Sequence, residues 1–286
     1  TPLTYAAWGG AVDCMTFLLS KGAQLEAKDK WGATAAHHAA EHDRSRALKL
    51  LVDKGLDVDV RDASGRTPLM YAAENGAREC MTFLLENGAQ PEAKDENGSI
   101  VAHYAARASS SGPLRLLVDR SVDVDVADSN GRTPLMYAAR ESALECMIFL
   151  IEIGARLDAK DKTGQIVAHY AVNATTTRPL ELLVDKGVSV DVVDYYRRTL
   201  LMVAAESDAV ECMHFLLDKG ARLNAKDIFG MTVAHHAAPA SSYRPLKLLA
   251  EKGVNVDAAD AVGETPLMRA ALMDAVECMT YLLESG

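Results

Sequence analysis

Basic residues are scarce in this chain relative to acidic ones. Lys and Arg together number 30 against 40 Asp and Glu, which gives a formal net charge of −10. This balance argues against a nucleic-acid partner, because a phosphate backbone is held by Lys and Arg side chains that face it. It disfavours an anionic lipid surface for the same reason.

Long apolar runs are missing as well. No run reaches the roughly 18 residues of a spanning helix, so we expect no direct membrane insertion in this segment. The apolar fraction of 49% is nevertheless ample for a core and argues against disorder.

Signatures of catalysis are absent too. The sequence has no G-x-x-x-x-G-K phosphate loop, no G-x-S-x-G elbow and no C-x-x-C pair. We therefore expect neither enzyme activity nor a cofactor or metal.

Cysteine is infrequent, and its placement is regular. The five cysteines recur at one constant interval, at Cys14, Cys80, Cys146, Cys212 and Cys278. Such spacing marks one structural position copied along the chain, and disulfides need Cα atoms within about 7 Å. We interpret these residues as free, buried thiols and expect a cytoplasmic, reducing location.

In contrast to these absent features, the sequence contains a strict internal repeat. The tripeptide TPL occurs at Thr1, Thr67, Thr133 and Thr265, with TLL at Thr199, and related blocks such as TAAHHAA lie halfway between them. The sequence is therefore built from short units of equal length, two to each interval between cysteines. Successive units start at residues 1, 34, 67, 100, 133, 166, 199, 232 and 265.

Each unit reads as two short helices and a turn. In the unit that starts at Thr67, this threonine is the expected N-cap and Pro68 the first helical residue. Asn75-Gly76 breaks the helix, and Cys80 to Leu85 supplies the core face of a second helix. A turn follows at Asp95–Gly98.

These residues resemble the ankyrin repeat family. TPLxxAA, the 33-residue period and the D-x-x-G turn carry the resemblance over essentially the whole chain. It implies an all-α fold, an α-solenoid of stacked helix-turn-helix repeats with projecting β-turn fingers. We expect residues 1–286 to form one array. Both end units keep the apolar pattern of internal ones, so we expect a segment of a longer array or a larger protein.

Proline distinguishes the even units from the odd ones. Pro113, Pro179 and Pro245 stand at the offset of the cysteines, behind Ser- and Thr-rich stretches. Proline is accepted at a helix start but not in its middle. We therefore expect the second helix of these units to begin about a turn late.

Histidines repeat with the same spacing as the cysteines, at His37, His103, His169 and His235. Packed helices lie about 8–10 Å apart, so residues two repeats apart are too distant to share a metal ion. The family resemblance instead implies that these side chains tie neighbouring turns together by hydrogen bonds.

Position five of four consecutive units is tyrosine, at Tyr71, Tyr104, Tyr137 and Tyr170. One interpretation is that the rings pack along the first-helix layer with their hydroxyls in water. The other is a binding stripe, because tyrosine is enriched at interface hot spots. Arg66, Arg132 and Arg198 recur at the finger base and are candidates for an acidic partner segment; their alternative is solvated charge.

Several finger tips are apolar where polar residues are expected. Trp31 lies on one tip, Tyr195 and Tyr196 on another, and Ile228 and Phe229 on the next. Exposed apolar patches usually mark interaction sites.

The leading hypothesis is a non-catalytic scaffold that binds partner proteins through the concave face and finger tips, as a monomeric array or part of a larger assembly. The alternatives are an architectural spacer in a cytoskeletal or membrane-channel assembly, or a targeting appendage of an enzyme or toxin outside this segment. The predicted partner-binding residues are Trp31, Arg66, Tyr71, Tyr104, Arg132, Tyr137, Tyr170, Tyr195, Tyr196, Arg198, Ile228 and Phe229.

Overall fold

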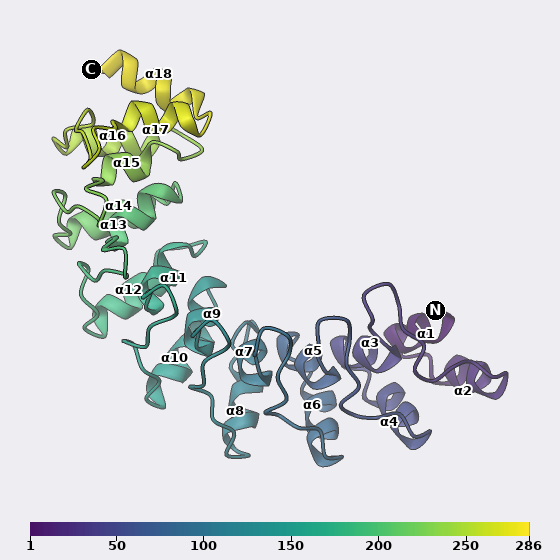
Figure 1. Cartoon of the computed structure of the whole chain (residues 1–286). Helices are drawn as coiled ribbons and strands as arrows, with labels where there is room; N and C mark the ends of the chain where they lie inside the picture. The colour runs from purple at the N-terminus through teal and green to yellow at the C-terminus, as the bar shows by residue number, and fades with distance from the viewer. Residues whose placement is uncertain (286) are drawn as a thin grey trace. The chain divides into compact units, whose positions relative to one another are not determined.

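A computed structural model describes residues 1–285, which form 18 short helices (Figure 1). Their bounds are α1 Pro2–Gly9, α2 Val12–Ser20, α3 Ala35–Glu41, α4 Ser45–Asp53, α5 Pro68–Glu74, α6 Arg78–Glu86, α7 Val101–Ala105, α8 Gly112–Val118, α9 Pro134–Arg140, α10 Leu144–Glu152, α11 Val167–Val172, α12 Arg178–Asp185, α13 Leu200–Glu206, α14 Val210–Asp218, α15 Val233–Ala237, α16 Arg244–Glu251, α17 Pro266–Leu272 and α18 Val276–Ser285. Each repeat contributes two helices, and a long loop leads to the next repeat. Within residues 1–285 the structure has no strand beyond an isolated bridge between Val193 and Thr199. The fold is the predicted all-α repeat solenoid.

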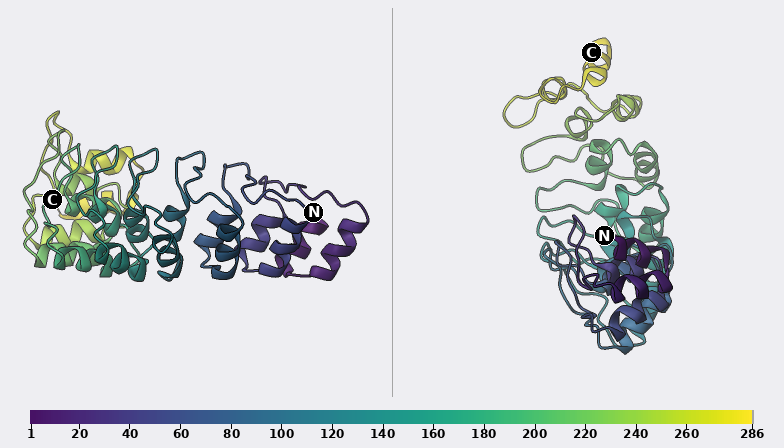
Figure 2. Two further views of the ribbon diagram at one scale, coloured as in Figure 1. Left: turned by 90° about the horizontal axis from the view of Figure 1, so that it is seen from below. Right: turned by 90° about the vertical axis from the view of Figure 1, so that its right-hand side faces the viewer.

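The chain divides into two compact units. Unit 1 comprises residues 1–138 and 143–156, and unit 2 comprises residues 139–142 and those from 157 onward. In unit 1 the first helices α1, α3, α5 and α7 contact one another in order, and α2, α4, α6 and α8 form a second layer. Unit 2 repeats this arrangement with α11, α13, α15 and α17 in one layer and α14, α16 and α18 in the other. Within each unit the long loops project to one side of the helices (Figure 2).

Small residues let the first helices pack closely. In α5, Ala72 and Ala73 are fully buried, and Gly76 ends the helix with a φ of 70°. Thr67 holds the N-cap position in extended conformation, but its hydroxyl makes no hydrogen bond within residues 1–285. The amide of Met70, which a capping hydroxyl would bind, donates to the Thr67 carbonyl instead, at 3.0 Å.

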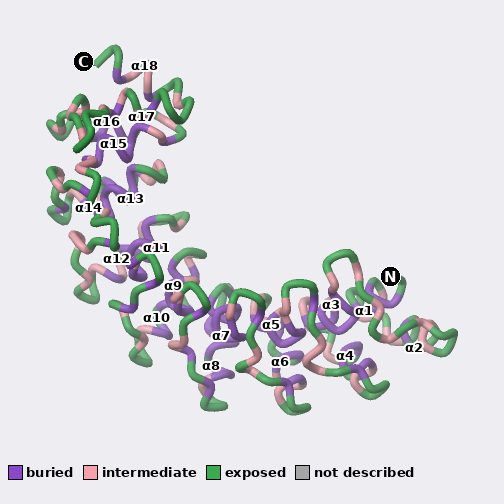
Figure 3. Tube along the Cα trace, in the orientation of Figure 1, coloured by how far each residue is buried: buried purple, intermediate pink, exposed green. Residues whose placement is uncertain are grey.

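Leucine, methionine and cysteine fill the space between the two helix layers. In α6, Cys80, Met81 and Leu84 are fully buried, and the Cys80 thiol lies 3.6 Å from the carbonyl oxygen of Ala39 in the preceding repeat. All five cysteines are free, and four are buried as predicted, while Cys14 is exposed. The buried positions follow the facing sides of the helices, whereas the loops are largely exposed (Figure 3).

The second helices of the proline-bearing repeats do not begin a turn late. In the repeat that starts at Ile100, α8 begins at Gly112, only one position later than α6 begins in the repeat that starts at Thr67. Pro113 is the second residue of α8, where the missing N–H costs no hydrogen bond. The prediction was wrong because the proline already sits within the tolerant first turn. Ser111 occupies the N-cap position without a side-chain cap bond.

We call each loop between repeats a finger, and every finger is organised by one aspartate. The Asp62 carboxylate accepts the backbone amides of Ser64 and Arg66, at 2.8 and 2.9 Å. Equivalent bonds form at Asp29, Asp95, Asp128, Asp161, Asp194, Asp227 and Asp260. Within each unit, a backbone hydrogen bond joins neighbouring fingers, as from the Glu96 amide to the Ser64 carbonyl at 3.0 Å. The fingers are thus built on a repeated aspartate turn, as the D-x-x-G motif predicts.

Candidate protein-binding surface

Each position-five tyrosine holds the finger that immediately precedes its own repeat. Each hydroxyl donates to the aspartate nine residues earlier, at distances of 2.8 Å (Tyr71 to Asp62), 2.7 Å (Tyr104 to Asp95), 2.8 Å (Tyr137 to Asp128) and 2.6 Å (Tyr170 to Asp161). The hydroxyls are therefore bound to carboxylates of the fingers, whereas the first interpretation of these rings left them to water. Burial raises the pKa of Tyr104, and its bond to Asp95 raises that pKa further. Tyr104 and Tyr170 are buried, so their rings offer little free surface.

Histidine takes the place of tyrosine in two repeats. His38 Nε2 lies 2.9 Å from Asp29, and His236 Nε2 lies 3.0 Å from Asp227. Position five is thus a latch that fixes the base of the finger. Val203 cannot form such a bond, and at that repeat the Arg198 guanidinium takes the role, with Nε 2.8 Å from Asp194 Oδ2.

The finger-base arginines point toward their own fingers. Arg66 Nε lies 2.8 Å from Asp62, and its guanidinium sits 4.4 Å from the Tyr71 ring centre. Arg198 bonds Asp194 in the same way and reaches Glu206 at 3.5 Å. The Arg132 amide donates to Asp128. The side chains of Arg66 and Arg198 are therefore bound to their own fingers, and a partner would meet only their outer atoms.

The recurring histidines tie a helix start to the next finger, as predicted. His37 Nδ1 accepts the Thr34 amide at 3.0 Å, and Nε2 lies 3.0 Å from the Arg66 carbonyl. His103 and His235 form the same bridge to the carbonyls of Arg132 and Glu264. His169 Nε2 faces the Arg198 carbonyl but has no hydrogen bond of proper geometry within residues 1–285. Residues 1–285 contain no group of three His, Cys, Asp or Glu side chains that could hold a metal ion.

Apolar finger tips gather in unit 2. Tyr195, Tyr196, Ile228 and Phe229 are 44–60% exposed, and we call them the tip patch. The Ile228 amide donates to the Tyr196 carbonyl at 2.9 Å, so the two tips lie side by side. The next tip continues the row, because the amide of Ala261 bonds the Phe229 carbonyl at 3.1 Å and Val262 is 80% exposed. Sequence reasoning missed Val262, although its place two repeats after Tyr196 is visible in the period.

Arg197 gives the finger of Tyr195 and Tyr196 an unusual backbone. It has a φ of 59°, and glycine holds the equivalent position in the neighbouring fingers, at Gly164 and Gly230. A side chain in this left-handed region costs about 1 kcal/mol or more. This turn therefore carries backbone strain.

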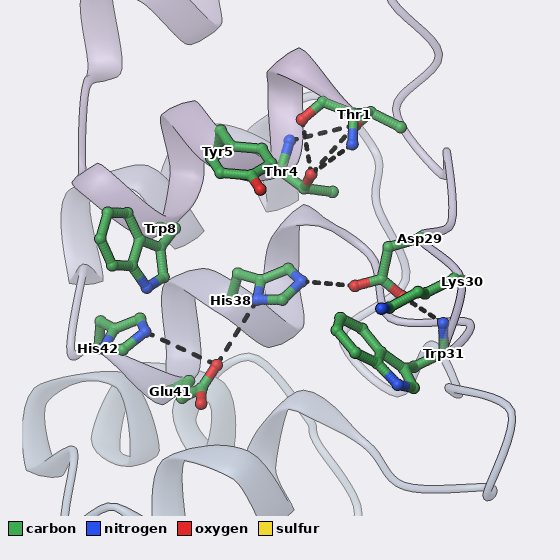
Figure 4. A pocket seen from close by; sticks show the side chains of 10 residues that line it. All are labelled: Thr1, Thr4, Tyr5, Trp8, Asp29, Lys30, Trp31, His38, Glu41 and His42. Atoms are coloured by element: carbon green, nitrogen blue, oxygen red, sulfur yellow. Dashed lines mark hydrogen bonds and ion pairs between the residues drawn. The ribbon is translucent and has the colours of Figure 1, made fainter.

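Trp31 belongs to a separate site in unit 1 (Figure 4). It lines a pocket of about 660 Å³ with Trp8, Asp29, His38 and other residues from α1, α3 and the first finger. The Lys30 ammonium sits 4.1 Å from the Trp31 ring centre, a cation–π contact. Trp8 and Trp31 lie at opposite ends of this pocket, and His38 lies between them.

Carboxylates and imidazoles alternate along this pocket. His38 lies between Asp29 and Glu41, at 2.9 and 3.5 Å, and His42 lies 3.7 Å from Glu41. Burial opposes the charge on Asp29, but hydrogen bonds from His38 and two backbone amides outweigh it and lower the pKa of this carboxyl. Aromatic walls with two carboxylates suit an apolar or cationic side chain of a partner.

The fold and these surfaces define a helical repeat protein with exposed apolar side chains on its fingers. The family model for ankyrin repeats matches residues 3–95, 91–161, 153–227 and 224–286, and the chain belongs to the ankyrin repeat family. Proteins of this family are in general protein–protein interaction modules and typically non-catalytic. No curated protein matches the sequence. Among residues 1–285, no helix has the length and apolarity needed to cross a membrane.

Proposed function

We propose that this chain is a non-catalytic module that captures a partner protein through its finger tips and the exposed face of its first helices, the concave face of the family. The observation that carries the proposal is the tip patch. Its side chains are large, apolar and exposed on fingers joined by backbone hydrogen bonds. A surface ordered in advance loses little conformational entropy on binding.

The predicted contact residues differ in how much exposed apolar area they offer a partner. The tip patch and Trp31 carry exposed apolar area. The position-five tyrosine hydroxyls and the guanidinium groups of Arg66 and Arg198, by contrast, are hydrogen-bonded to finger aspartates. The tips therefore supply the binding energy in this proposal, and the tyrosines and arginines supply their rigid support. Aromatic anchors commonly dominate protein interfaces in this way.

The test is a triple replacement within the tip patch, Tyr195→Ser, Tyr196→Ser and Phe229→Ser. We expect partner capture in a quantitative pull-down to fall at least about tenfold, since each removed anchor costs roughly 1–2 kcal/mol of binding. Helical circular dichroism should stay unchanged, because none of these side chains is in the core.

The matched control replaces exposed apolar residues elsewhere. Ile148 and Ile153 are each 44% exposed at α10 and its C-terminal end. The double variant Ile148→Ser, Ile153→Ser should capture partners as the unaltered chain does. Equal capture by the tip variant and the unaltered chain would overturn the proposal and favour the spacer hypothesis.

A further inference from the structure

A basic pocket lies beside the tip patch. It has a volume of about 640 Å³ and is lined by Asp191, Val193 and Arg197 from one finger and by Arg222, Asn224 and Lys226 from the next. We call it the basic pocket. It therefore joins the two fingers that carry Tyr195, Tyr196, Ile228 and Phe229.

Positive charge in the basic pocket is only partly compensated. Arg222 Nε pairs with Asp191 at 3.2 Å, and that carboxylate is the single anion of the lining described. Among residues 1–285, the side chains of Arg197 and Lys226 form no ion pair. Two free cations thus face a pocket in a chain whose formal net charge is −10.

The backbone conformation of Arg197 also supports a functional role for this side chain. The residue keeps a φ of 59° where the fingers on either side have glycine, so its side chain is present despite a backbone cost. Strained residues that persist in a fold gather at functional sites. The guanidinium suits a carboxylate because its planar N–H groups match two oxygens at once.

We propose that the partner presents an acidic segment, whose carboxylates enter the basic pocket while a neighbouring apolar side chain lies on the tip patch. This inference rests on the proposed function, since it assigns the chemistry of the same partner. Lys160 adds to the positive field, with its ammonium 5.4 Å from the Tyr195 ring centre. A nucleic acid fits less well, because its many phosphates would also meet the excess of Asp and Glu on this chain.

The test is a selection of short random peptides on the immobilised chain, followed by affinity measurements on those selected. We expect peptides that combine Asp or Glu with an aromatic or aliphatic residue. Replacing their Glu by Gln should weaken binding about tenfold, the effect of one charge-assisted contact. Raising the salt concentration should weaken the acidic peptides more than their Gln versions.

Arg197→Gly separates binding from folding. It restores the glycine of the neighbouring fingers, so the unfolding temperature should hold or rise. Affinity for the acidic peptides should fall about tenfold, to the level of their Gln versions. Lys247→Gln is the control, because it removes one positive charge from an exposed position on α16. It should change neither the affinity for the acidic peptides nor the affinity for their Gln versions.

The other possible results of these experiments would contradict the proposal of an acidic partner segment. The proposal of an acidic segment would be overturned by any one of four results. These are selection of apolar peptides without acids, no selection at all, unchanged affinity in Arg197→Gly, or binding of oligothymidylate that is tighter than binding of the selected peptides. The proposed function is judged separately, since partner capture that survives loss of the tip patch overturns it. If peptide binding depends on the tip patch but not on Arg197, the proposed function is retained and only the acidic-segment proposal is overturned.

Discussion

At the scale of single residues, the finger aspartates do most of the organising. Asp95 accepts the amides of Asn97 and Ser99 on one oxygen and the Tyr104 hydroxyl on the other. It is a buried carboxylate that accepts hydrogen bonds from its own finger and from the first helix of the following repeat. Such a group is tolerated in a protein interior because its oxygens are satisfied.

Tyr104→Phe tests this latch. The change removes the donor to Asp95 Oδ2 and leaves a buried carboxylate oxygen short of a partner. We expect a loss of about 1–3 kcal/mol in the free energy of unfolding, measured by urea denaturation. Tyr5→Phe is the matched control, because Tyr5 is 76% exposed, and its effect should stay within about 0.5 kcal/mol. Equal effects of the two changes would contradict the latch.

At the scale of elements, the contact between neighbouring fingers sets the tip row. Gly164 has a φ of 83°, and a methyl group there would come within 2.6 Å of the Tyr195 backbone nitrogen. That nitrogen donates to the Thr163 carbonyl at 3.0 Å. Glycine is therefore needed at this position both for the turn and for the approach of the next finger.

Gly164→Ala should expose this dependence. The left-handed backbone alone costs about 1 kcal/mol, and the contact with Tyr195 should add about 1–3 kcal/mol, as overpacking does. Gly187→Ala separates the two effects, because Gly187 has a φ of 91° and no atom lies within 4 Å of the added methyl group. Urea denaturation of both variants measures the difference. If Gly164→Ala and Gly187→Ala lower the free energy of unfolding equally, the close approach of the Tyr195 finger does not contribute to the cost at Gly164.

The repeat period predicted the helix pairs, the buried cysteines and the aspartate turns, because each follows from local sequence and nearest-neighbour packing. The start of α8 was misplaced, since a proline is equally acceptable at the second helical position. One of the two interpretations of the tyrosines left the Tyr71 hydroxyl in water, because sequence spacing does not show that the finger folds back to bring Asp62 within 2.8 Å. The basic pocket was not predicted, since Arg197, Arg222 and Lys226 come together only through the stacking of two fingers.

At the scale of the whole molecule, four buried histidines recur along the chain and link its stability to pH. Burial lowers the pKa of His37 to about 4, and burial likewise lowers the pKa of His103, His169 and His235. The hydrogen bonds agree with the neutral ring. His37 Nδ1 accepts the Thr34 amide, so a proton on that nitrogen would face another donor.

The sign of the effect follows from linkage. The unfolded chain binds protons on these histidines below about pH 6.5, while the folded chain does not until about pH 4 at His37. Their contribution to stability is therefore complete above pH 6.5 and falls as the pH drops toward 4. For His37 alone the loss approaches about 3 kcal/mol.

The free energy of urea unfolding should therefore fall between about pH 7 and pH 5, a range in which most carboxylates stay ionised. His37→Gln should lower stability at pH 7, because the tie to Arg66 is weakened, and it should flatten the dependence on pH. His214→Gln is the control, since His214 is exposed on α14 and its loss should leave the slope intact. A slope that survives His37→Gln unchanged would contradict the assignment and place the proton uptake elsewhere in the chain.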